Sequence, residues 1–169
     1  YRLRKLLPDG RYLTSFGTSG RIDGEVSGND MTIDSSGKAY VLGSTCTTRH
    51  TAAGPKDSGW GSFVLLVGGS ALTLDSGGKV YVTGSSTTIK LNADGSLATG
   101  FNSPAGYVTY YGDAFPAGDV DFRGIRVDAS GNVYVVGAQT PSNTPSLWSV
   151  LKYTSAGTDA AKTVFLGSM

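Results

Sequence analysis

The sequence has little of the chemistry that enzymes and metal sites need, with one Cys, one His and one Glu among 169 residues. A single cysteine excludes an internal disulfide framework and any cysteine-based zinc or haem site. Charged residues make up only 16% of the chain and the formal net charge is +1, so the basic character of a nucleic-acid-binding protein is missing. No apolar run is long enough to span a bilayer as a helix. We therefore expect a protein without catalysis, cofactor or membrane span.

Glycine, in contrast, is abundant at 25 residues, and Ser and Thr are frequent, while regularly placed apolar residues argue against disorder. The length suits one domain, residues 1–169. A low-charge composition of this kind is typical of bacterial extracellular proteins, so we expect a secreted or cell-surface location. The chain begins at Tyr1 rather than Met and has no apolar signal segment, which predicts either a removed leader or a piece of a longer protein.

The strongest signal is an internal repeat. Three segments align, each with an Asp-x-x-Gly turn between two apolar stretches: Met31–Gly43, Leu72–Gly84 and Ile125–Gly137. The Asp can accept backbone N–H groups, and the Gly can take the positive φ that a tight turn requires. Val and Tyr alternate on the second stretch of each copy, which predicts a strand covered on both faces. Each copy is therefore predicted to be a β-hairpin.

A second element recurs with the same rhythm. Lys5–Arg11 and Lys90–Ser96 each contain an Asp-Gly turn, and Lys152–Thr158 matches them more loosely. Together the two elements predict about four short strands per period of roughly 40–50 residues, as in a propeller blade. A β-sandwich is the competitor, but it does not need the same hairpin three times. We predict an all-β chain, a β-propeller of about four blades that is either incomplete or closed by its two termini.

These residues resemble known repeat families. The run Asp-Ser-Ser-Gly-Lys-Ala-Tyr-Val-Leu-Gly (34–43), with Lys-Leu-x-x-Asp-Gly-Ser-Leu (90–97), resembles the bacterial SBBP-type β-propeller repeat. Residues 1–22 resemble the delta-sixty repeat of bacterial secreted proteins. The resemblance covers most of the chain except roughly 44–61 and 138–147. It implies a secreted scaffold or binding role, and no catalytic residue is carried over because these repeats share no active site.

The blade between the first two hairpins is short, since Leu66 to Asp75 leaves no room for an outer strand. This predicts an unpaired sheet edge that a partner protein or a second copy would cover, with Val67, Gly68 and Gly69 as contact residues. Aromatic residues are the other binding candidates, although packing between blades would use them equally well. These candidates are Trp60, Tyr110, Tyr111 and Trp148.

The alternative function is a carbohydrate-binding, lectin-like propeller, because aromatic rings beside carboxylates bind sugars. Asp113, Asp119 and Asp121 share one loop and are the best calcium candidates, but no calcium-loop spacing is met, so we predict no metal site. Cys46 and His50 lie four residues apart in a loop and are expected to be there by chance rather than as a nucleophile pair.

A small group of basic residues lies on both sides of the first predicted turn. On an edge strand such charges protect against pairing between sheets, and an anionic polysaccharide or partner surface is the alternative. Its members are Arg2, Arg4, Lys5 and Arg11.

Overall fold

The computed structural model describes residues 1–24, 27–61, 68–110, 119–140 and 147–165, and these residues form strands and turns without a helix. The all-β prediction is therefore confirmed. The strands are β1 (Arg2–Arg4), β2 (Arg21–Asp23), β3 (Asp30–Ile33), β4 (Ala39–Leu42), β5 (Thr47–His50), β6 (Ala71–Leu74), β7 (Val80–Gly84), β8 (Thr87–Leu91), β9 (Tyr107–Thr109), β10 (Asp119–Val127), β11 (Val133–Thr140), β12 (Leu147–Tyr153) and β13 (Asp159–Phe165).

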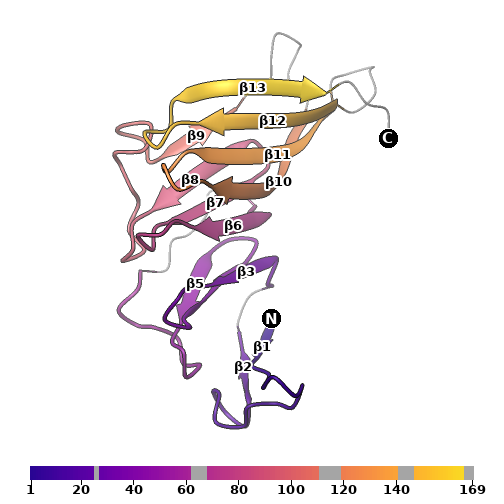
Figure 1. Ribbon diagram of the computed structural model, residues 1–169, viewed down its shortest axis with the longest axis vertical. Helices are drawn as coiled ribbons and strands as arrows, with labels where there is room; N and C mark the ends of the chain where they lie inside the picture. The colour runs from indigo at the N-terminus through magenta and orange to yellow at the C-terminus, as the bar shows by residue number, and fades with distance from the viewer. Residues whose placement is uncertain (25–26, 62–67, 111–118, 141–146, 166–169) are drawn as a thin grey trace.

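The strands form four antiparallel sheets in chain order: β1-β2, β3-β4-β5, β6-β7-β8-β9 and β10-β11-β12-β13. Within each sheet, every strand pairs with the next one along the chain, so each sheet is a meander. The sheets follow one another along the long axis of the molecule, from β1-β2 at one end to β10–β13 at the other (Figure 1). The first strands of the last three sheets are neighbours, because β6 contacts both β3 and β10.

Closure through the two termini, which the sequence allowed, is not seen in the described part of the chain. The first strand, β1, pairs with β2, and the last strand, β13, pairs with β12. Figure 1 places these two sheets at opposite ends of the molecule. The two ends of the stack of sheets are therefore separate surfaces.

The three predicted hairpins are present and share one hydrogen-bond pattern. In the first, Oδ1 of Asp34 accepts the backbone N–H groups of Ser36 (2.9 Å) and Lys38 (3.0 Å), and Gly37 has a φ of +82°. Oδ2 accepts a bond from the Tyr40 hydroxyl at 3.3 Å, which fixes the turn to the second strand. The same bonds link Asp75 with Gly77, Lys79 and Tyr81, and Asp128 with Ser130, Asn132 and Tyr134.

A cation from the third strand of each hairpin-containing sheet lies over this tyrosine. Arg49, Lys90 and Lys152 stand directly opposite the three tyrosines across the strand pair, at 5.7, 5.0 and 5.1 Å from the ring centroids. A cation over an aromatic face is attracted by the ring's quadrupole. Two of these cations also reach the next sheet, since Arg49 donates to the Ala93 carbonyl at 3.0 Å and Lys90 to the Ser155 carbonyl at 3.1 Å.

The Asp-Gly turn has a copy that the sequence pattern did not reveal. Thr51 to Pro55 form the same turn, with the Thr51 N–H on the Pro55 carbonyl at 2.9 Å and Gly54 at a positive φ. Backbone bonds between consecutive turns then join the sheets: Gly17 N–H to Ala53 O (2.8 Å), Gly61 N–H to Asp94 O (2.9 Å) and Asn102 N–H to Ala156 O (2.7 Å). The turns therefore form a continuous connection along the stack.

Among the described residues, the hydrophobic core is divided into three clusters. The largest lies around β10 to β12 and contains Phe101, Phe122 and Tyr153. A second lies around β7 and β8, and the smallest joins Leu3 and Phe16 to β4. Every residue of β4 and β7 is buried, as the alternation of Val and Tyr predicted. Each cluster fills the space beside one sheet and its neighbour, so the stability of a sheet depends on the sheet next to it.

Candidate functional site: the open face beside β1

One position of the repeated hairpin differs sharply in exposure between sheets. Met31 lies three residues before Asp34, as Leu72 does before Asp75 and Ile125 before Asp128. Leu72 is 3% exposed and Ile125 2%, but Met31 is 43% exposed. Ile33, two residues further along β3, is 59% exposed. The apolar face that a preceding sheet covers in the later sheets is thus open on β3.

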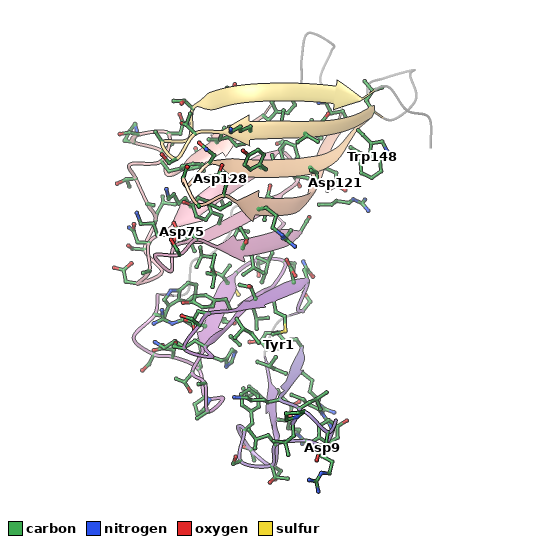
Figure 2. All side chains as sticks on the ribbon, viewed as in Figure 1. Tyr1, Asp9, Asp75, Asp121, Asp128 and Trp148 are labelled. Atoms are coloured by element: carbon green, nitrogen blue, oxygen red, sulfur yellow. The ribbon has the colours of Figure 1, made fainter. Side chains whose placement is uncertain are left out.

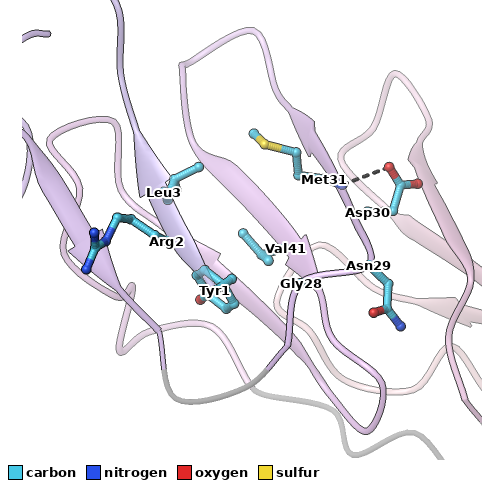
Figure 3. Close-up of a pocket in the computed structure, with 8 residues that line it drawn as sticks. All are labelled: Tyr1, Arg2, Leu3, Gly28, Asn29, Asp30, Met31 and Val41. Carbon is cyan, nitrogen blue, oxygen red and sulfur yellow. Dashed lines mark hydrogen bonds between the residues drawn. The ribbon is translucent and has the colours of Figure 1, made fainter.

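A cavity of about 340 Å³ lies on this open face (Figure 3). Its walls come from the start of the chain on one side and from β3 and β4 on the other. The lining residues are Tyr1, Arg2, Leu3, Gly28, Asn29, Asp30, Met31 and Val41. Within the described residues β1 pairs on one edge only, with β2, so its other edge offers free backbone donors and acceptors at the cavity.

The β3 side of this cavity is tied to the next sheet by two polar side chains. Asp30 accepts the Met31 N–H at 2.8 Å through Oδ1 and the Leu72 N–H at 2.9 Å through Oδ2. Asn29 donates from its side-chain amide to the Gly69 carbonyl at 2.7 Å. These bonds hold β3 in a fixed position relative to β6 while its other face stays open.

The β1 side is held by Tyr1. Its hydroxyl lies 3.0 Å from Thr48 Oγ1 and 2.7 Å from His50 Nε2. His50 Nδ1 donates to the Gly54 carbonyl at 2.9 Å, because a carbonyl oxygen only accepts, and Nε2 is then the acceptor for the Tyr1 hydroxyl. Both ring nitrogens of the buried His50 therefore form hydrogen bonds within the fold. Cys46, the other member of the predicted pair, is half-buried and precedes β5.

The predicted basic patch is paired in part. Arg2 and Arg21 both pair with Asp23, at 2.6 and 3.1 Å, and Arg11 pairs with Asp9 at 2.7 Å. Arg4 lies over the Tyr12 ring, 4.3 Å from its centroid. The hydrogen bond from Arg2 lowers the pKa of Asp23, so this carboxylate stays charged in ordinary buffers. The ion pairs are exposed and contribute little to stability.

Only some of the predicted contact residues at the short blade and of the predicted aromatic residues are described by the structure. Val67 and Tyr111 lie outside the described residues. Gly68 is exposed, whereas Gly69 is buried where Asn29 contacts it. The described flank of the predicted edge is thus part of the contact between two sheets.

The three other predicted aromatic residues have different environments. Trp60 is buried, with its ring edge-on to Tyr40 at 5.8 Å. Tyr110 is partly buried against the largest core cluster, and its hydroxyl accepts a bond from Gln139 at 3.2 Å. Trp148 is 48% exposed on β12, at the opposite end of its sheet from the Asp128 turn (Figure 2). The structure does not bring these residues together into one surface.

The calcium candidates are not assembled into a site in the part of the chain that the structure describes. Asp113 lies outside it, Asp119 begins β10, and Asp121 is paired with Arg123 at 2.8 Å. Among the described residues no group of three His, Cys, Asp or Glu side chains is close enough to hold a metal ion. No helix among them could cross a membrane.

No family model and no curated protein matches this chain. A solved structure of a protein of unknown function from Bacteroides caccae is similar to it, with a TM-score of 0.55 and 14% sequence identity. The match covers 87% of this chain and 49% of that one, so the chain spans about half the length of the solved structure. At this identity the similarity concerns the fold alone.

Proposed function

We propose that the chain is an extracellular structural and protein-interaction module, built from propeller-type blades, that works in assembly or adhesion and has no catalytic activity. The observation that carries this proposal is the exposure of Met31 at a position that is buried in the two later hairpins. Completely burying a large apolar side chain is worth roughly 1.5–3 kcal/mol. Met31 and Ile33 are about half exposed, so a partner that covers them gains about half of this value for each side chain.

The propeller interpretation is supported by the arrangement of the sheets. Two of them have four meandering strands, and the first strands of successive sheets are neighbours, as are the innermost strands of propeller blades. By the position of its turn, β1-β2 corresponds to the third and fourth strands of such a blade. We infer that further strands, from a partner or from another part of the same protein, pair with the edge of β1 that faces the cavity.

The extracellular location rests on composition and on the resemblance to secreted repeats, and both remain predictions. Low charge with many Gly, Ser and Thr residues fits a secreted module. Fractionation of the source cells, with an antibody against the chain, tests this. Recovery in the cytosol alone would contradict the location without affecting the assembly proposal.

The assembly proposal is tested by placing charge on the open face. Met31→Asp should abolish self-association or partner binding, measured by sedimentation velocity with the native chain over a wide concentration range and with candidate partners. Val136→Asp is the matched control, since Val136 is also exposed but lies on β11, in the last sheet of the stack. If both variants assemble as the native chain does, the open face is not the contact. If the native chain stays monomeric and binds no partner, the proposal fails.

A further inference from the structure

Two of the sheets place a pair of cations at the same point of the repeat. In the β3–β5 sheet these are Lys38 and Arg49, and between them lies the carboxylate of Asp57. Asp57 Oδ2 is 2.9 Å from Arg49 Nη2 and 3.4 Å from Lys38 Nζ. Oδ1 accepts the backbone N–H of Gly59 at 3.2 Å. The Asp57 carboxylate thus occupies the space between the two cations and the Gly59 N–H, which we call the cation cradle.

The β6–β9 sheet has the same cradle without the carboxylate. Lys79 and Lys90 correspond to Lys38 and Arg49, and Ala98 stands where Asp57 stands. The correspondence is structural, because the Asp57 N–H bonds to the Arg49 carbonyl at 2.8 Å and the Ala98 N–H bonds to the Lys90 carbonyl at 2.9 Å. Replacing Asp by Ala therefore removes the anion and leaves its surroundings in place.

A cavity of about 360 Å³ is found at this point. It is lined by Lys79, Lys90, Asn92, Ala98, Thr99, Gly100, Phe101 and Ser155. Gly100 corresponds to Gly59, the backbone donor in the filled cradle. Phe101 lies behind the cavity, with its ring buried in the largest core cluster. The cavity is large enough for a ligand of about the size of a monosaccharide and has donors at one end.

The charge balance of this cavity favours an anion. Lys90 is buried, with Nζ 3.1 Å from the Ser155 carbonyl and 5.4 Å from the centre of the Phe101 ring. Burial, and then the neighbouring charge of Lys79, lower the pKa of Lys90. Neither lysine forms an ion pair with a described carboxylate, and Asp75, the nearest acid acting on Lys90, is used by its own turn. A ligand carboxylate would supply the missing negative charge.

We propose that this cavity binds the carboxylate group of a small acidic ligand such as a sugar acid. Lys79 and Lys90 take the roles that Lys38 and Arg49 have around Asp57, and the Gly100 N–H takes the role of Gly59. Hydrogen bonds between a carboxylate and charged donors are short and strong, and a partly buried site retains them in salt. This site is independent of the open face beside β1, which lies in another sheet.

Calorimetric titration of the native chain with glucuronate tests the proposal, with glucose as the neutral control of the same size. We expect one site for glucuronate, with a Kd on the order of 1 mM or tighter for a small ligand with one charged anchor, and no binding of glucose. Lys79→Gln should weaken binding about tenfold through the loss of one charge-assisted bond. Lys5→Gln removes an exposed lysine elsewhere and should leave the affinity unchanged.

Two further variants add a carboxylate to the empty cradle or remove the carboxylate from the filled one. Ala98→Asp should abolish glucuronate binding, because the new carboxylate occupies the site as Asp57 does. Asp57→Ala should raise the stoichiometry from one to two by opening the equivalent cavity. Circular dichroism verifies that each variant is folded, and if Ala98→Asp is not, Lys79→Gln and Asp57→Ala carry the test.

Three results would overturn the proposal: glucuronate does not bind the native chain, it binds Ala98→Asp or Lys79→Gln as tightly as the native chain, or glucose binds equally well. Sulfate serves as a second anion in the same titration. If sulfate binds as tightly as glucuronate, the site recognises charge alone and the assignment to carboxylates is wrong.

Discussion

Met31 and Leu72 occupy the same place in two copies of one hairpin, yet Met31 is 43% exposed and Leu72 is 3% exposed. The turns that follow them are built alike, with the same Asp and Tyr contacts. What differs is the neighbour, since β6 has β3 on one side and β10 on the other, whereas β3 has a cavity. The repeat therefore determines the conformation of a hairpin, and its position in the stack determines its burial.

The largest change in stability is expected when the side chains of Leu72 and Met31 are each truncated to Ala. Leu72→Ala should lower the free energy of unfolding by about 3–5 kcal/mol, because it leaves a cavity between packed sheets. Met31→Ala should cost less than about 1 kcal/mol, since a half-exposed side chain loses little burial. Urea unfolding of both variants measures the two values. Equal losses would mean that β3 is covered as well as β6.

The turn glycines allow a second test. Gly10 and Gly95 have the same φ, +85° and +86°, but a Cβ would meet nothing within 4 Å at Gly10, and at Gly95 it would lie 2.3 Å from the Gly61 carbonyl oxygen. Gly10→Ala should cost about 1–2 kcal/mol from the left-handed conformation alone. Gly95→Ala adds about 1–3 kcal/mol of steric conflict with the preceding sheet. Thermal unfolding should therefore rank Gly95→Ala as the less stable variant.

The contact between Tyr and Asp is expected to have a smaller effect. Tyr81→Phe keeps the ring packed in the core and removes only the hydroxyl that bonds to Asp75 at 3.2 Å. The loss of one hydrogen bond should lower the free energy of unfolding by about 1 kcal/mol. Tyr134→Phe removes the corresponding bond to Asp128 from a less buried ring. It should cost no more than Tyr81→Phe, and a larger loss in denaturant unfolding would contradict this ranking.

The smallest effect concerns pH. Burial alone would raise the pKa of Asp34, but hydrogen bonds from Ser36, Lys38 and Tyr40 together lower it below 3.8. A carboxyl whose pKa is lower in the folded state stabilises the fold above about pH 4, and this contribution is lost as pH falls through the folded-state value. Asp34→Asn should therefore reduce the dependence of stability on pH below 4. Unfolding curves from pH 2 to 7 measure it, and an unchanged dependence would contradict the prediction.

The hairpins and their turns were predictable from the sequence because each depends on residues close together in the chain. Asp34 and Gly37 act within one turn, so their identity and spacing were sufficient. The turn at Thr51–Pro55 was missed because Arg49 replaces the Lys that precedes the other copies and Ala53 replaces the Asp of the two clearest ones, although backbone bonds alone form the turn. A turn that is held by backbone hydrogen bonds alone can form with many residue types, so the sequence indicates it only weakly.

The candidate sites were harder to predict because they depend on which sheets are neighbours. Trp60 was a binding candidate, but the next sheet buries it beside Tyr40. The exposure of Met31 could not be predicted either, since its hairpin matches the buried copies. The exchange of Asp57 for Ala98 was detectable in principle, by aligning the repeats on Arg49 and Lys90 and looking for a lost carboxylate. That alignment requires knowledge of the turn at Thr51–Pro55, which the sequence pattern did not reveal.

The backbone bonds that join consecutive turns, such as that from Gly61 to Asp94, connect each sheet only to its neighbours. If the chain is pulled by its two termini, the load should pass through these contacts one after another rather than through all of them at once. Extension in an optical trap should therefore show several small ruptures, each releasing one sheet. A chain of this construction would lengthen stepwise under tension while its remaining sheets stayed folded.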